Sequence, residues 1–154
     1  MEVQPDYSEL LALFDAHNVA CMIVGAHALA YHGAPRYTGD LDILVQANPE
    51  NAARVLRALD EYGFGSLGLT HDDFAAPDNV VQLGHAPVRI DILTSLTGVT
   101  WEECLAGCCA DCYGEVPVRY LGKEALIRNK RALGRAKDFA DIEALEGGSQ
   151  RMPH

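Results

Sequence analysis

The chain has 154 residues, of which 49% are hydrophobic, and its formal net charge is −10. This length and composition are typical of one domain with a sizeable core. The sequence has no run of about 18 apolar residues, which excludes a membrane-spanning helix. The first ten residues (MEVQPDYSEL) lack the pattern of a secretory leader. We therefore expect a cytoplasmic protein without a membrane partner.

The charge is unevenly distributed along the chain. Residues 1–118 carry 17 acidic and 4 basic side chains, whereas residues 119–154 carry 8 basic and 5 acidic ones. Six of those basic residues lie between Lys123 and Lys137. Positive charge gathered in one segment is what phosphate binding requires. A basic helix face exposed to solvent would give the same pattern.

The first predicted elements are a helix, a buried strand and a second, short helix. Helical spacing of apolar residues predicts the first helix over residues 8–17, and an apolar run predicts the strand over residues 19–24. Gly25 follows the strand directly and opens a predicted helix over residues 26–32. The first N–H groups of a helix have no partner within it, so the turn at Gly25 is a candidate anion site.

Asp40 and Asp42 lie in the next predicted strand, which covers residues 40–45. Side chains alternate across a strand, so both carboxylates project from one face while Leu41 and Ile43 point into the core. Two adjacent carboxylates repel each other unless a cation lies between them. A metal site beside an anion site indicates a nucleoside triphosphate. A D-x-D pair at the exposed start of a strand is the simpler alternative.

The middle of the chain predicts a helix from Pro49 to about residue 62, a loop-rich segment over residues 63–79 and a β-hairpin. The hairpin strands are expected at residues 79–83 and 88–93. Asp91 lies within the second of these strands, where a buried acid needs a partner. It could pair with Arg89 or Arg36, or it could supply a third oxygen ligand to the Asp40 and Asp42 site. We favour the ligand interpretation.

The C-terminal third predicts a helix, one strand and two further helices. The helix is expected over residues 100–109 and the strand over residues 116–120, where Pro117 indicates an edge position. Helices over residues 123–133 and 137–145 are separated by Gly134. We expect a single domain over residues 1–146, and a flexible tail over residues 147–154.

Five cysteines, four of them close together, raise the question of a second metal site. Their number is odd and no export signal is present, so reduced thiols are expected. Thr100 and Glu103 form a T-x-x-E capping box that starts a helix, on which Cys104 and Cys108 would lie one turn apart. The spacing fits no standard zinc site. We therefore expect ordinary thiols rather than a metal site. The five are Cys21, Cys104, Cys108, Cys109 and Cys112.

Three blocks of sequence, in this order, resemble a known family. They are GAHALAYHGAPRYTGDLDILV, the QLG…RIDILTSL…GV block and LIRNKRALGRAKDFADIEAL. Together they are similar to the polymerase-β-type nucleotidyltransferase superfamily. More closely they resemble small bacterial nucleotidyltransferase-like proteins related to the abortive-infection (AbiEii-like) nucleotidyltransferase toxins. The resemblance covers residues 19–145. It implies an α+β nucleotidyltransferase fold, with a mixed β-sheet flanked by helices and a helical C-terminus.

The resemblance also implies roles for particular residues. Asp40, Asp42 and Asp91 would be catalytic and would bind Mg²⁺ or Mn²⁺. In the related toxins a Lys and an Arg on a C-terminal helix belong to the active site, as does a basic–Asp pair that follows them. The residues implied to bind nucleotide here are Gly25, Ala26, His27, Arg36, Lys130, Arg135, Lys137 and Asp138.

Gly25-Ala26 departs from the family, which usually shows Gly-Gly or Gly-Ser at this point. Alanine offers its backbone N–H but no hydroxyl, and it has less conformational freedom than glycine. Phosphate binding would then be weaker than in the family, unless His27 contributes.

These observations predict an Mg²⁺-dependent nucleotidyltransferase. It would move a nucleoside monophosphate from a nucleoside triphosphate to a hydroxyl acceptor, which could be RNA such as tRNA, a protein or a small molecule. The alternative is a nucleotide- or partner-binding protein on the same fold that has lost catalysis, such as one component of a toxin–antitoxin pair. We expect the three carboxylates to converge within metal-sharing distance. We also expect Lys130 and Arg135 to face them across a cleft.

Overall fold

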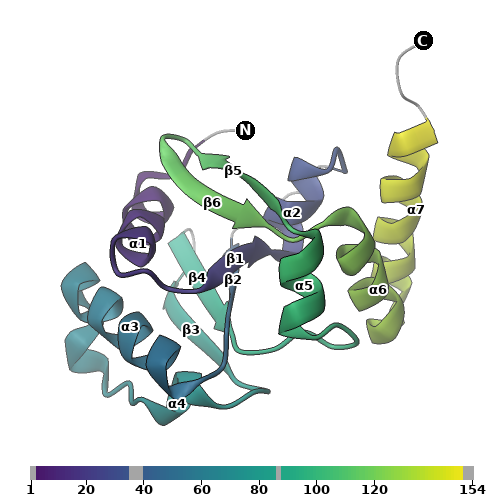
Figure 1. Cartoon of the computed structure of the whole chain (residues 1–154). Coiled ribbons are helices and arrows are strands. Elements are labelled where there is room, and N and C mark those ends of the chain that lie inside the picture. Colours follow the sequence, from purple (N-terminus) through teal and green to yellow (C-terminus); the bar gives the residue numbers. More distant parts are fainter. Residues whose placement is uncertain (1–2, 35–39, 86–87, 151–154) are drawn as a thin grey trace.

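The computed structural model describes residues 3–34, 40–85 and 88–150. A six-stranded mixed sheet forms its centre, with the strand order β3-β4-β2-β1-β6-β5 (Figure 1). Strand β2 pairs with β1 antiparallel and with β4 parallel. The strands are β1 (Cys21–Val24), β2 (Asp40–Val45), β3 (Val80–His85), β4 (Val88–Leu93), β5 (Cys109–Tyr113) and β6 (Val116–Tyr120).

The described ranges contain seven α-helices besides the sheet, and two of them form the C-terminal part, as the sequence predicts. Two short helical turns, Asp60–Phe64 and Gly65–Leu67, follow α3. The α+β class with a mixed sheet and a helical C-terminus is confirmed. The helices are α1 (Pro5–Ala16), α2 (Gly25–Tyr31), α3 (Pro49–Leu59), α4 (Asp72–Ala75), α5 (Trp101–Gly107), α6 (Lys123–Leu133) and α7 (Ala136–Gln150).

The two faces of the sheet bury different sets of side chains. One core joins α1 and α3 to apolar residues at odd positions of β2 and even positions of β4, such as Ile43 and Ile92. A second core lies on the other face, where Leu44 packs with residues of α2, α5 and α6. Figure 1 shows α1 and α3 on one side of the sheet and α5, α6 and α7 on the other. Because side chains alternate, Asp40, Asp42 and Asp91 project from the face that α1 and α3 do not cover.

The segment after α5 differs from the expectation. The helix predicted to reach Cys109 ends at Gly107, and residues 109–113 form β5, which pairs antiparallel with β6 through a turn at Gly114. Strand β5 buries only Tyr113, so its sequence carries no alternating apolar pattern that could have predicted it.

Pro117 was expected on an edge strand, but β6 lies between β1 and β5. That prediction is wrong for the strand as a whole. Strand β1 pairs with β6 only at Ile23 and Tyr120, so Pro117 is paired with β5 alone. Its missing N–H therefore interrupts no pairing with β1.

All five cysteines are free, as expected; Cys104 is buried in α5 and Cys108 caps that helix. Helix α7 continues to Gln150, past residue 147 where the sequence predicts a flexible tail. Propagating an existing helix is far easier than starting one. Within the described ranges, no helix is both long and apolar enough to cross a membrane.

Candidate functional site

Four charged side chains form a square on two neighbouring strands, and we call this group the acid array. Asp40 and Asp42 come from β2, and Arg89 and Asp91 come from β4. The parallel register places Asp40 opposite Arg89 and Asp42 opposite Asp91. Directly paired residues project from the same face of a sheet. The structure therefore brings the three predicted acids together, with an arginine at the fourth corner.

Arg89 binds two of the three acids. Its Nη2 lies 2.9 Å from Oδ2 of Asp40 and 3.2 Å from Oδ2 of Asp91. The ion pair that the sequence left open as an alternative for Asp91 is thus present, and it includes Asp40 as well. In the part of the chain that the structure describes, no three His, Cys, Asp or Glu side chains are arranged to hold a metal ion. The expected convergence of the three carboxylates on one metal ion is therefore not seen in this arrangement.

Asp42 and Asp91 are incompletely compensated. Burial raises the pKa of the Asp42 carboxyl to about 7, and the neighbouring charges of Asp91 and Asp40 add to this shift. The Oδ1 atom of Asp91 is buried and has no hydrogen-bond partner. A buried polar atom without a partner costs free energy. The acid array therefore carries more negative charge than Arg89 neutralises.

Gly25 is required by its contact with Asp42. Its φ of +66° lies in the left-handed region that favours glycine. A Cβ atom at this position would also clash with Oδ2 of Asp42. Helix α2 begins at this residue, directly after β1, and no side chain caps it. The sequence-based emphasis on Gly25 thus has a second physical reason, which is the close approach of the Asp42 carboxylate.

A cavity of about 380 Å³ joins this site to the C-terminal helices. Gly25 and Asp42 lie on its lining, and so do Lys130 and Arg135 from the α6–α7 region. Asp91, the register partner of Asp42, is only 8% exposed. Lys130 and Arg135 therefore line the same cavity as Asp42, whereas Asp40, Arg89 and Asp91 do not line it, and the expectation that the two basic residues face the carboxylates across a cleft stays a prediction.

Lys130 and Arg135 are held by two acids of α7, and we call these four residues the α6–α7 cluster. The Nζ atom of Lys130 lies 3.0 Å from Oδ2 of Asp141 and 3.6 Å from Oδ1 of Asp138. Asp138 also accepts hydrogen bonds from Arg135 through Nε (2.6 Å), Nη2 (3.1 Å) and the backbone N–H (3.1 Å). These hydrogen bonds are the main reason that the pKa of Asp138 is lowered to about 2.

Several residues that the resemblance implied for nucleotide binding do not reach the cavity. Lys137 is exposed on α7 and Ala26 is half-buried on α2, and neither belongs to the lining. The ring of His27 packs edge-on against Tyr7 and Tyr113, with centroid distances of 5.8 and 6.3 Å, and burial lowers its pKa. Arg36 lies outside the described residues. Their assignment to nucleotide binding stays a prediction.

The cavity also contains residues that the sequence did not single out. Asp78 and Ser95 bond to each other on its lining, through the Asp78 backbone N–H to Ser95 Oγ (3.0 Å) and Ser95 Oγ to Asp78 Oδ1 (3.1 Å). Val80 is 58% exposed and Leu133 is 37% exposed, and both line the cavity. The polar run Thr94-Ser95, directly after the strand that carries Asp91, could have indicated these cavity residues. Ligands often bind beyond the carboxyl ends of strands.

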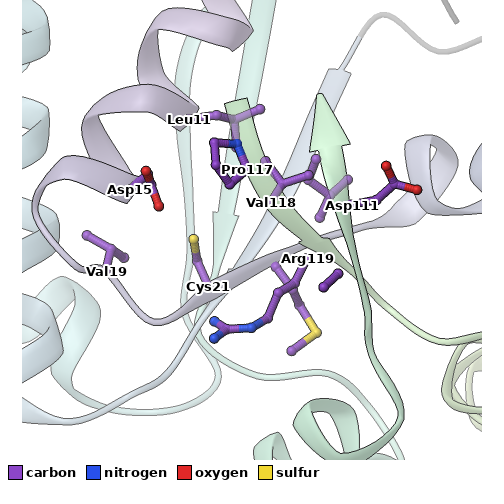
Figure 2. A pocket seen from close by; sticks show the side chains of 11 residues that line it. Leu11, Asp15, Val19, Cys21, Asp111, Pro117, Val118 and Arg119 are labelled. Atoms are coloured by element: carbon purple, nitrogen blue, oxygen red, sulfur yellow. The ribbon is translucent and has the colours of Figure 1, made fainter. Parts of the chain in front are cut away.

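A second cavity, of about 260 Å³, lies between α1, β1 and the β5–β6 hairpin. Figure 2 shows Asp15 and Cys21 on one side of it and Pro117, Val118 and Arg119 on the other. Burial raises the pKa of the Cys21 thiol to about 12, so it stays protonated and is a poor nucleophile. This cavity lies at the end of β1 remote from Gly25, and no residue of the acid array lines it.

Comparison with known proteins gives a likeness in structure alone. No family model and no curated protein matches the sequence. A structure of TM1012 from Thermotoga maritima, a candidate nucleotidyltransferase, matches with a TM-score of 0.60 and 16% identity over 97% of both chains. The antibiotic-resistance factor ANT(2″)-Ia matches with a TM-score of 0.56 and 14% identity, over 97% of this chain and 83% of that one. The lincosamide antibiotic adenylyltransferase LnuA matches with a TM-score of 0.52 and 13% identity, over 93% of this chain and 96% of that one.

These matches do not test the relation to the abortive-infection toxins, which stays a prediction. Their identities of 13–16% establish the fold and no more. The structural matches show that the chain has the nucleotidyltransferase fold.

Proposed function

We propose that this protein is a nucleotidyltransferase, which transfers a nucleoside monophosphate from a nucleoside triphosphate to a hydroxyl acceptor. The observation that carries the proposal is the cavity of about 380 Å³, with Asp42 on one wall and Lys130 and Arg135 also on its lining. Nucleotidyl transfer needs carboxylates where the metal-bound phosphate reacts, and positive charge where pyrophosphate leaves. The lining of this cavity includes both kinds of side chain.

The acid array has the donor chemistry that a divalent cation such as Mg²⁺ or Mn²⁺ needs, although its side chains are not arranged around an ion in this structure. Asp40, Asp42 and Asp91 offer the oxygen ligands that hard cations prefer. An added positive charge would give the buried Oδ1 of Asp91 a partner and would lower the raised pKa of Asp42. When bound, the ion would supply charge neutralisation at the reacting phosphate and its attacking and leaving oxygens.

The chain's own residues have separate tasks in this proposal. The acceptor oxygen forms a bond to the α-phosphorus, and the bond to the pyrophosphate oxygen breaks, in line with the attack. Asp91 takes the proton of the acceptor hydroxyl. Lys130 and Arg135 bind the departing pyrophosphate. Asp138 engages only Nε and Nη2 of the Arg135 side chain, and a guanidinium has five N–H donors, so donors remain for phosphate.

The molecules bound in the matching structures indicate which acceptor class to test first. One matching structure is of ANT(2″)-Ia in complex with adenylyl-2″-tobramycin, and that of LnuA is lincomycin-bound. A small hydroxyl compound is therefore the first acceptor to test here. RNA and protein remain the other two classes.

The test is a transfer assay on the full chain with each α-labelled nucleoside triphosphate, in Mg²⁺ or Mn²⁺. Acceptors are small hydroxyl compounds, total RNA and protein extract in separate reactions. We expect label transfer with one acceptor class. We also expect Asp91→Asn to bind nucleotide almost normally while losing transfer by about a hundredfold or more, because its role belongs to the transition state.

The alternative is a nucleotide- or partner-binding protein without catalysis, and one observation favours it. Arg89 already lies between Asp40 and Asp91, where a catalytic ion would bind. Such a protein would bind triphosphate and transfer label to none of the three acceptor classes. Absence of triphosphate binding by calorimetry, in either metal, would contradict both functions.

A further inference from the structure

We propose that Arg89 is a built-in competitor of the metal ion. Its guanidinium stabilises the metal-free acid array and must release Asp40 and Asp91 when a divalent cation binds. This inference rests on the proposed function only in assuming that the acid array binds such a cation. It adds a residue that controls metal occupancy.

The geometry places one atom of Arg89 where a shared cation would lie. A single nitrogen, Nη2, contacts both carboxylates, at 2.9 Å from Asp40 and 3.2 Å from Asp91. The parallel register fixes this arrangement, because Arg89 is the direct partner of Asp40 and precedes Asp91 by two residues on the same strand face. Asp40 and Asp91 would help to hold the ion, and the Arg89 guanidinium now engages these same two carboxylates.

The charges explain why a divalent cation can still bind although Arg89 is present. One guanidinium faces three carboxylates, and it forms ion pairs with Asp40 and Asp91 through a single nitrogen. A divalent ion brings twice the charge of Arg89 to the same three acids. The arginine therefore relieves the repulsion in part, which stabilises the metal-free protein, and leaves the site with affinity for a stronger cation.

The arginine is also free to leave. Its side chain is 37% exposed, so the released guanidinium can reach solvent. Its Nε is buried without a hydrogen-bond partner, so withdrawal breaks no further bond at that atom. The backbone stays in place, because the Arg89 carbonyl accepts a hydrogen bond from the Tyr7 hydroxyl (3.2 Å) and β4 is paired on both sides. Only the side chain needs to move.

A supporting role for Arg89 predicts the opposite result. If the guanidinium stays beside the bound ion and orients the carboxylates, its removal weakens metal binding, as loss of a residue behind the metal ligands commonly does. If it competes, its removal strengthens metal binding. The sign of the change in metal affinity therefore decides between the two roles.

The experiment titrates Mn²⁺ into the full chain without nucleotide and follows free Mn²⁺ by electron paramagnetic resonance. The variants are Arg89→Gln, Arg89→Lys and, as a control with the same charge change, Arg57→Gln on the exposed side of α3. We expect Arg89→Gln to bind Mn²⁺ about three to ten times more tightly than the wild type, as the loss of partly exposed ion pairs suggests. Arg89→Lys should lie between them, and Arg57→Gln should match the wild type.

Thermal unfolding gives a second readout on the same proteins. In EDTA the unfolding temperature of Arg89→Gln should lie below that of the wild type. Saturating Mn²⁺ should then raise the unfolding temperature of Arg89→Gln by more than it raises that of the wild type. If Arg89→Gln does not fold, Arg89→Lys carries the affinity comparison, and unchanged or weaker binding in it contradicts competition.

The outcomes separate this inference from the proposed function. Weaker or unchanged Mn²⁺ binding in Arg89→Gln, with normal binding in the wild type, overturns the competition and leaves the proposed function standing. Absence of Mn²⁺ binding in the wild type and in every Arg89 variant overturns both. Tighter binding in Arg57→Gln as well would show a general effect of net charge and would also overturn the role given to Arg89.

Discussion

The acid array and the α6–α7 cluster are each built from four charged residues, and they differ in charge balance. The acid array has three carboxylates and one arginine, and the pKa of its Asp42 is raised to about 7. The α6–α7 cluster has two acids and two cations, and the pKa of its Asp138 is lowered to about 2. One group needs further positive charge, whereas the other is internally satisfied.

This difference indicates different tasks for two groups that contribute residues to the same cavity. An unbalanced acidic group is what a cation-binding site requires before its ion arrives. A balanced group contributes stability, since its charges already have partners, and it holds Lys130 and Arg135 in fixed positions. Variants can test each half of this comparison separately.

Gly25→Ala should give the largest effect, because it acts on the acid array and on the backbone together. The new Cβ would clash with Oδ2 of Asp42, and alanine is strained at a φ of +66°. We expect a loss of about 2–4 kcal/mol in the free energy of unfolding and a large loss of Mn²⁺ affinity. Chemical denaturation and a Mn²⁺ titration measure the two.

Gly33→Ala is the matched control for that variant. Gly33 also has a positive φ, of +88°, but a Cβ there meets no atom within 4 Å. It should lose only about 1 kcal/mol from backbone strain and keep its Mn²⁺ affinity. Equal effects of the two variants would show that Gly25 has no special relation to Asp42.

Lys130→Met should have the next largest effect, and this substitution acts on the α6–α7 cluster. The Lys130 side chain is 12% exposed, and its removal takes one cation away from both Asp138 and Asp141. We expect a loss of about 2–3 kcal/mol in the free energy of unfolding. Arg131→Met, on the same helix, removes an exposed pair with Glu146 and should cost about 0.5 kcal/mol or less. Similar losses in both would contradict a buried, structural role for Lys130.

Arg135→Ala should weaken triphosphate binding by about tenfold, as loss of one charge-assisted contact usually does. The loss should shrink as salt is raised, because the guanidinium is half-exposed and screened by ions. Calorimetry at two salt concentrations measures this effect. Arg128→Ala removes a cation that pairs with Glu103 and does not line the cavity, so it serves as the control. Unchanged triphosphate affinity in Arg135→Ala would show that the α6–α7 cluster contributes only to stability.

A further expected effect, confined to low pH, is on acid stability. The pKa of Asp138 is lowered from 3.8 to about 2 by its hydrogen bonds with Arg135. A carboxyl with a lowered pKa contributes stability that is full above the unfolded value of 3.8 and is lost as the pH falls through 2. Asp138→Asn should therefore flatten the decline in unfolding free energy between pH 4 and pH 2. An unchanged decline would show that Asp138 titrates normally.

The sequence predicts the parts of the site that depend on short spacings. Asp40 and Asp42 share a strand face because side chains alternate, and Gly25 directly follows an apolar run that predicts a strand. The bridge made by Arg89 could not be predicted, since it depends on the register between β2 and β4. The Asp78–Ser95 contact joins two loops 17 residues apart, and no local pattern records that proximity.

The fold shows the same limit. The strong apolar runs of β1 and β4 were predicted within two residues of their bounds. Strand β5 was missed because it buries a single side chain and is defined by its pairing with β6. The resemblance implied that Lys137 binds nucleotide together with Lys130 and Arg135, but Lys137 is exposed on α7 and does not line the cavity.

The comparison of the two groups is tested most directly by Mn²⁺ titration of Asp42→Asn and Asp141→Asn, which each remove one carboxylate charge. We predict that Asp42→Asn loses most Mn²⁺ affinity and unfolds at a higher temperature than the wild type without metal, because like-charge repulsion is relieved. We predict that Asp141→Asn keeps its Mn²⁺ affinity and unfolds at a lower temperature, because Lys130 loses its partner at 3.0 Å. Equal Mn²⁺ affinities in Asp42→Asn and the wild type would contradict the assignment of the acid array as the metal site.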